Sequence, residues 1–143
     1  MPARHDINAN QGETLNFHLL YTDTADNSID LANYSAELQS RRSTSSSDKL
    51  LHLSGSTAGP QGVTAGITGA TSGLSGGIWL NRNAGNTGSL TGGILIVAGA
   101  TATSLVPNGK HLYDLELKYI PDGTVTRLIE GRFDCPSEVT RWK

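Results

Sequence analysis

The sequence predicts an all-β fold, an antiparallel β-sandwich of about seven or eight strands with Ig-like or Greek-key connections. Several short segments alternate apolar and polar residues, as strands do when they bury one face. The chain of 143 residues contains 17 glycines, and serine and threonine are also abundant. Only 36% of the residues are hydrophobic and 17% are charged, so strands, turns and long loops are favoured over helices.

The stretch Leu112–Gly131 carries the clearest signal. From Tyr113 to Tyr119, large apolar or aromatic residues alternate with charged ones, and Pro121-Asp122-Gly123 follows. Proline presets φ in a turn and glycine accepts positive φ. We therefore predict a β-hairpin in which Thr124 to Phe133 returns as the antiparallel partner.

Alternation predicts further strands along the chain. Leu15 to Tyr21 and Tyr34 to Leu38 show it clearly, and weaker patterns cover Lys49–Ser54, Gly77–Asn81 and Gly92–Ala98. The run Ile94–Val97 is apolar on both faces, which indicates a central strand. Ala100 to Leu105 is expected to form one helical turn.

We predict a single β-sandwich domain at residues 14–135, with an N-terminal arm at 1–13 and a C-terminal tail at 136–143. Gly55 to Gly76 is rich in glycine, alanine, serine and threonine and is predicted to be a long surface loop. The alternative is an extended arm that packs on a neighbouring subunit. Trp79 is expected in the core.

The charge balance limits the classes of partner. A net charge of −2 and a pI of about 6.0 give no basic field for nucleic acid, so no nucleic-acid partner is expected. No run of about 18 apolar residues exists, so no membrane span is expected. The first residues lack the apolar core of a signal peptide. A surface poor in charge favours a protein that works inside an assembly.

Motifs for catalysis or cofactor binding are missing from the sequence. It contains no G-x-S-x-G and no P-loop, and its four histidines share no metal-binding spacing. We therefore predict no catalytic residue, no cofactor and no metal, and a protein that is not an enzyme. The single cysteine, Cys135, cannot form an intrachain disulfide and is expected to be an inert thiol. Arg127 shares a face with Val125 and Ile129 in a regular strand, which indicates either an ion pair or a partner contact.

The two ends of the chain are the candidate partner interface. Aromatic residues and arginine are enriched at protein interfaces. The residues chosen on this basis are Pro2, Arg4 and His5 in the N-terminal arm and Arg141 and Trp142 in the tail. For the tail, the alternative is a frayed, exposed end.

Three segments carry a resemblance to a known family. They are IDLANYSAELQSR (Ile29–Arg41), YDLEL (Tyr113–Leu117) and VTRLIEGRFDCPSEVTR (Val125–Arg141). In this order they resemble a family of small structural proteins from tailed bacteriophages and prophages, similar to the N-terminal domain of baseplate upper proteins. The resemblance implies a compact β-sandwich that attaches receptor-binding or fibre proteins to the tail.

On this resemblance we expect a non-enzymatic virion protein, a tail or baseplate component or an adaptor at the fibre attachment site. The implied partners are other virion proteins, with several copies of the chain in the particle. Synthesis in the host cytoplasm without a signal peptide would precede incorporation into the virion. One alternative is a cement protein that decorates the major capsid protein. Another is a carbohydrate-binding β-sandwich whose aromatic platform would be Trp79, Tyr34 and Tyr119.

Overall fold

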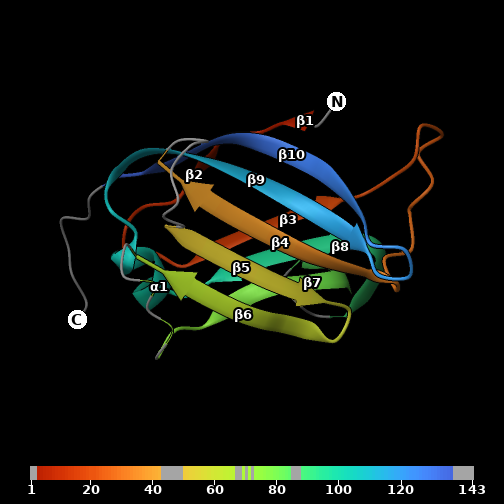
Figure 1. Cartoon of the computed structure of the whole chain (residues 1–143), viewed down its shortest axis with the longest axis horizontal. Helices are drawn as coiled ribbons and strands as arrows, with labels where there is room; N and C mark the ends of the chain where they lie inside the picture. Colours follow the sequence, from red (N-terminus) through yellow and green to blue (C-terminus); the bar gives the residue numbers. More distant parts are fainter. Residues whose placement is uncertain are drawn as a thin grey trace.

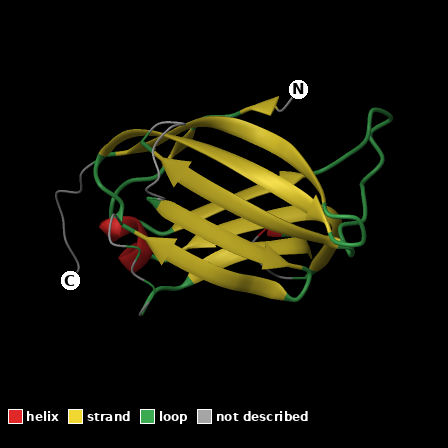
Figure 2. Ribbon diagram, viewed as in Figure 1, coloured by secondary structure: helices red, strands yellow, loops and turns green. Residues whose placement is uncertain are grey.

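A computed structural model describes residues 3–42, 50–66, 69, 71, 73–84 and 88–136. Almost all of its regular structure is strand, with one short helix, α1 (Ala100–Leu105) (Figure 2). The strands are β1 (Ala3–Arg4), β2 (Ile7–Asn8), β3 (Leu15–Leu20), β4 (Tyr34–Arg41), β5 (Leu51–Ser56), β6 (Gly59–Ala65), β7 (Gly76–Arg82), β8 (Ser89–Ala98), β9 (Gly109–Tyr119) and β10 (Thr124–Cys135). In the part of the chain that the structure describes, no helix is long and apolar enough to cross a membrane.

The strands form one sheet that curls into two layers. Its order is β1-β10-β9-β4-β5-β7-β8-β3, with β2 beside β10 and β6 beside β5. Figure 1 shows β10, β9, β4 and β5 in the front layer and β7, β8 and β3 behind them. Most neighbours are antiparallel; the exceptions are β1 and β2, which are parallel to β10, and β7, which is parallel to β5 but antiparallel to β8. The predicted all-β antiparallel sandwich is confirmed.

The two layers join at a corner where β5 meets β7. These strands pair in parallel over only two residue pairs, Gly55 with Ile78 and Ser56 with Trp79. A Cβ atom on Gly55 would lie 1.7 Å from the carbonyl oxygen of Ile78. Only glycine permits this approach of two backbones. The glycine therefore allows the sheet to turn from one layer into the other.

The core fills the space between the layers. The longer strands contribute alternate residues to it, because successive side chains point to opposite faces. Fully buried members from the front layer include Leu38, Leu53, Leu115 and Phe133, and those from the rear layer include Ile78, Leu80, Ile94 and Ile96. Leu95 points to the other face of β8 and is also fully buried. The prediction of a central strand at Ile94–Val97 is confirmed, since β8 lies between β7 and β3.

The predicted hairpin is confirmed, with one irregularity. β9 and β10 pair from Tyr119 with Thr124 to Gly109 with Cys135. The register shifts between Arg127 and Ile129, so one strand carries an extra residue there. Arg127 is consequently exposed while Ile129 is buried. The expectation that these two residues share a face is wrong, because the bulge breaks the period of two.

Two further expectations are corrected. The long loop predicted from Gly55 to Gly76 is wrong for its first half, since β6 (Gly59–Ala65) returns antiparallel to β5. Ala65 and Val63 supply enough apolar surface for that edge strand, and Ala65 is fully buried. Trp79 is half-buried rather than in the core. Its ring lies on the outer face, where the guanidinium of Arg82 covers it at 4.0 Å from the ring centroid.

Candidate functional site

The N-terminal segment lies along the edge of the last strand. β1 and β2 both pair in parallel with β10, and the residues between them continue the contact. The N–H of His5 donates to the carbonyl oxygen of Glu130 at 3.0 Å, and that of Ala9 donates to Asp134 at 2.9 Å. Ile7 and Ala9 are buried. The first part of the predicted N-terminal arm is therefore a piece of the sheet, and it covers the edge of β10.

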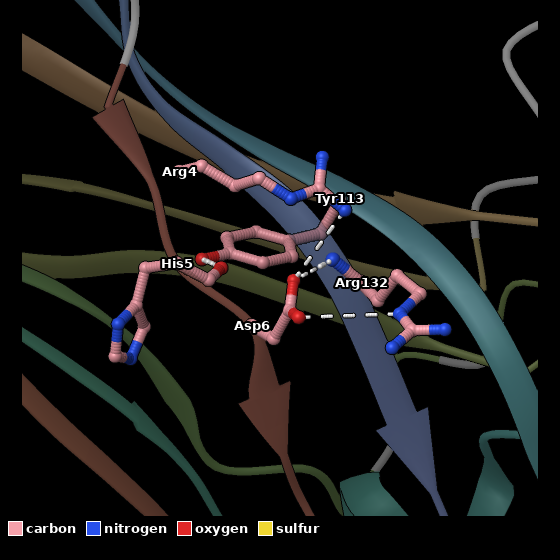
Figure 3. A network of polar contacts seen from close by, with 5 residues as sticks. All are labelled: Arg4, His5, Asp6, Tyr113 and Arg132. Carbon is pink, nitrogen blue, oxygen red and sulfur yellow. Dashed lines mark hydrogen bonds and ion pairs between the residues drawn. The ribbon is translucent and has the colours of Figure 1, made fainter.

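Gly131 and Tyr113 allow the N-terminal segment to lie close to β10. A Cβ atom on Gly131 would lie 2.2 Å from the carbonyl oxygen of His5, so only glycine leaves room for the backbone. The hydroxyl of Tyr113 donates a hydrogen bond to the same carbonyl oxygen (Figure 3). Burial, aided by the nearby charge of Asp6, raises the pKa of Tyr113 to about 12. The phenol therefore stays protonated and remains a donor throughout the neutral range.

Asp6 holds the segment from the solvent side. Its Oδ1 accepts a hydrogen bond from the backbone N–H of Arg132 at 2.9 Å. The guanidinium groups of Arg132 and Arg4 lie 3.9 and 3.7 Å from the carboxylate (Figure 3). The backbone hydrogen bond, with these charges, holds the pKa of Asp6 below its usual value. Exposed ion pairs of this kind stabilise little, so their effect is to set the position of the segment.

A shallow pocket of about 230 Å³ opens on the outer face of the sheet beside this segment. Its charged and polar wall residues are Arg4, Arg41, Arg127, Gln39, Asp114 and Glu130. Four of them form one cross-strand row, because Gln39 pairs with Asp114, Asp114 with Glu130 and Glu130 with Arg4. The row joins four adjacent strands.

Arg127 is the centre of the charges on this face. Its Nε lies 3.4 Å from Asp114 and 3.8 Å from Glu116. Partial burial raises the pKa of Asp114, and Arg127 opposes that rise. The alternatives for Arg127 were an ion pair and a partner contact, and the ion pair is present. Since the positive groups already have acidic neighbours, the pocket suits a partner surface of mixed charge better than a single anion.

A second exposed surface lies at the turn end of the β9–β10 hairpin. Ile120 and Val125 are 57% and 56% exposed. The rings of Tyr34 and Tyr119 are half-buried with their centroids 5.2 Å apart. Exposed apolar side chains near aromatic residues are typical of protein contact surfaces. Sequence reasoning missed this surface, although Ile120 next to a Pro-Asp-Gly turn is a usable signal.

The residues that the sequence predicted for partner contact lie in different environments. Arg4 lines the pocket, and its side chain is 67% exposed. His5 contributes its backbone carbonyl to the network, while its ring packs against Phe17 at 4.9 Å between centroids. Pro2, Arg141 and Trp142 lie outside the described residues. Tyr113 and Arg132 were missed, since no sequence signal links residues more than a hundred positions apart.

The remaining chemically active side chains are dispersed. Cys135 is buried, and burial raises its pKa to about 11, so the thiol is protonated and unreactive at neutral pH. The rings of His18 and His111 bond to the carbonyl oxygens of Arg82 and Pro107 at 2.9 and 2.7 Å. Within the described ranges, no group of three or more His, Cys, Asp or Glu residues could hold a metal ion.

Comparison with known proteins finds little. No family model matches the chain. No curated protein matches it either. A solved structure of the NK cell receptor Nkp44, described as a triggering partner in natural cytotoxicity, is 14% identical, with a TM-score of 0.45 over 96% of this chain and 100% of that one.

Proposed function

We propose that this chain is a non-enzymatic structural protein of a tailed phage virion, a component of the tail or baseplate or an adaptor where fibres attach. The proposal starts from the three segments that resemble small phage structural proteins. Those segments supply β4, β9 and β10, which are neighbours in the sheet. This adjacency is the observation that carries the proposal, because motifs far apart in sequence share one structural unit.

The chemistry of the outer face supports a binding role. Its charged side chains hold strands to one another. Asp6, which directly precedes β2, accepts a hydrogen bond from the backbone of β10, and Arg127 of β10 forms an ion pair with Asp114 of β9. A face of this kind can bind a partner through its shape and its pattern of charges, and binding needs no reactive group on the face. The mechanism is complementarity between rigid surfaces, with the hairpin as the scaffold.

The aromatic residues do not favour the carbohydrate-binding alternative. The guanidinium of Arg82 covers the ring of Trp79, and a Cβ atom on Gly59 would come within 2.8 Å of that ring. Tyr34 and Tyr119 pack on each other. These contacts occupy ring surface on which a sugar would stack.

The test is a location assay. Particles from the source strain are purified, heads are separated from tails, and the chain is quantified in each fraction by mass spectrometry. Enrichment in tails at about a dozen copies is the expected result. Enrichment in heads at hundreds of copies would instead identify a capsid decoration protein. Absence from both fractions would end the virion proposal.

The hairpin tip provides a matched pair of variants for the same assay. Ile120→Asp places a charge on the exposed apolar tip, whereas Ile120→Ser makes the tip polar without adding a charge. We expect the aspartate to reduce incorporation into tails more than the serine does, with the melting temperature of both purified variants unchanged. Equal incorporation of both variants and the wild type would show that the tip is not a contact surface.

A further inference from the structure

The two ends of the curled sheet are protected differently. At one end, the short strands β1 and β2 cover β10 and bring charged residues, Arg4 and Asp6, to the edge. At the other end lies β3, which pairs with β8 on one side and is the last strand of the described sheet on the other. Charged side chains, prolines and bulges are the usual protection of an exposed strand edge. β3 has none of them.

The sequence around β3 is neutral and apolar. From Thr14 to Thr22 it reads TLNFHLLYT, with no Asp, Glu, Lys, Arg, Pro or Gly. Leu20 is 49% exposed, and Phe17 and Leu19 are only half-buried at the rim of the core. By contrast the edge strand β6 carries Gly59, Pro60 and Gly62. β3 is therefore the strand best suited to accept another strand.

The hydrogen-bond pattern shows which backbone groups are free to pair. The N–H of Tyr21 donates to the carbonyl oxygen of Gly92 at 2.8 Å, and this pair continues the register of Leu20 with Gly93. Bonding alternates along an antiparallel pair, so the odd-numbered residues of β3 bond to β8. The N–H and C=O groups of Asn16, His18 and Leu20 consequently point away from β8, toward the open edge.

We propose that β3 is a homodimer interface, in which two copies of this chain pair β3 with β3 antiparallel about a two-fold axis at His18. His18 then lies opposite His18 of the second copy, and Asn16 lies opposite Leu20 of the second copy. On the core side, Phe17 lies opposite Leu19 of the second copy. The sheets of the two copies become continuous.

A second copy fits this edge for two reasons visible in the strand. The register is self-complementary, since the odd-numbered residues place only apolar and aromatic side chains opposite one another: Leu15 with Tyr21 and Phe17 with Leu19. The strand also carries no formal charge, so pairing with itself brings no like charges together. The ring of His18 bonds to the carbonyl oxygen of Arg82 of its own chain at 2.9 Å.

The dimer goes beyond the proposed function and does not rest on it. The virion assignment is measured on particles, whereas dimerisation is measured on the purified chain. Failure of either leaves the other standing.

The first experiment is sedimentation velocity on the purified full chain over a micromolar to millimolar series. We expect a concentration-dependent change from monomer to dimer. Asn16→Lys places a lysine on the edge of each copy and should weaken the dimer about tenfold or more, because the change occurs twice in a symmetric dimer. Asn16→Gln is the matched neutral control and should behave as the wild type. A wild-type chain that stays monomeric throughout would overturn the proposal, as would equal dimerisation of the lysine variant.

A charge exchange tests the register itself. Leu20→Glu alone should also weaken the dimer. Mixed with Asn16→Lys, it should form a heterodimer, because the introduced lysine and glutamate face each other. Recovery of the dimer in the mixture supports the predicted pairing. Two variants that are each monomeric and remain so when mixed would contradict it, provided that both keep the wild-type melting temperature.

Cross-linking gives an independent readout of the same register. Directly opposite hydrogen-bonded residues have Cα atoms about 5.5 Å apart, which suits a disulfide. His18→Cys should therefore form a covalent dimer under mild oxidation. Asn16→Cys should not, because its own counterpart is several residues away along the partner strand. The native Cys135 is buried and does not compete. Equal cross-linking of both variants would reject the two-fold axis at His18.

Discussion

Tyr113 donates its hydroxyl hydrogen bond to the backbone carbonyl of His5, a residue 108 positions earlier in the chain. The bond ties β9 to the N-terminal segment across β10. The ring of Tyr113 packs edge-on against that of Phe133, with 6.4 Å between the centroids. The buried hydroxyl of Tyr113 and the carbonyl oxygen of His5 thus satisfy each other's hydrogen bonding where β1 and β2 pair with β10.

We expect Tyr113→Phe to lower the free energy of unfolding by about 1 kcal/mol, because it removes one buried hydrogen bond and keeps the ring. Urea unfolding at neutral pH measures the change. Tyr119→Phe is the control, since that ring is half-buried against Tyr34 and its loss of the hydroxyl should change stability by less than about 0.5 kcal/mol. Equal effects of the two substitutions would contradict the assigned bond.

Alkaline pH should destabilise the protein in two steps. The pKa values of Cys135 and Tyr113 rise from 9.0 to about 11 and from 10.0 to about 12 on folding, mainly through burial. Each group stays protonated longer in the folded state than in the unfolded state. Their stabilising contribution is complete below pH 9 and 10 respectively and is lost as pH rises to about 11 and 12.

Melting temperature as a function of pH checks this expectation. Cys135→Ala should flatten the decline between pH 9 and 11, and Tyr113→Phe should flatten it between pH 10 and 12. A wild-type melting temperature that is constant from pH 8 to 12 would disprove the burial-driven shifts.

Leu115 tests the assignment of faces on β9. It is fully buried in the cluster between the layers. We expect Leu115→Ala to cost about 2–5 kcal/mol by chemical denaturation, as for other buried leucines. Val125→Ala, on the exposed hairpin, should change stability by less than about 0.5 kcal/mol. A loss below about 1 kcal/mol at Leu115 would mean that its side chain faces solvent.

Gly55→Ala tests the corner between the layers. The added methyl group would lie 1.7 Å from the carbonyl oxygen of Ile78, so β5 and β7 would have to separate. We expect a loss of about 3 kcal/mol or more, or failure to fold. Gly88→Ala is the control, because its nearest atom would be 3.9 Å away. If both variants melt at the same temperature, the two strands do not meet as closely as described.

The sequence predicted the strands with large alternating side chains and missed those without them. β9 was clear because Leu115 and Leu117 alternate with charged residues, and β10 followed from the Pro-Asp-Gly turn. β6 was missed because Gly59 to Ala65 contains a single branched residue besides threonine, so no period is visible. Burial there depends on the neighbouring strand, which local patterns do not report.

The candidate site could be predicted only in part. Arg4 and His5 were selected as candidates for a partner interface, and both lie at the edge of β10, where their contacts are with residues of the same chain. Their partners Tyr113 and Arg132 were not selected, because parallel pairing between the two ends of a chain leaves no local signature. The bulge beside Arg127 was also invisible, since nothing in its sequence marks the extra residue.

The union of the first strands with the last has a consequence for biosynthesis. Residues 3–8 are synthesised more than a hundred residues before their partners in β10, residues 129–134. No intermediate length of nascent chain can complete this edge, and the contact joins residues far apart in sequence. This edge therefore closes only after residues 129–134 have been synthesised, and a chain released before residue 129 would expose the unprotected edge of an unfinished sheet.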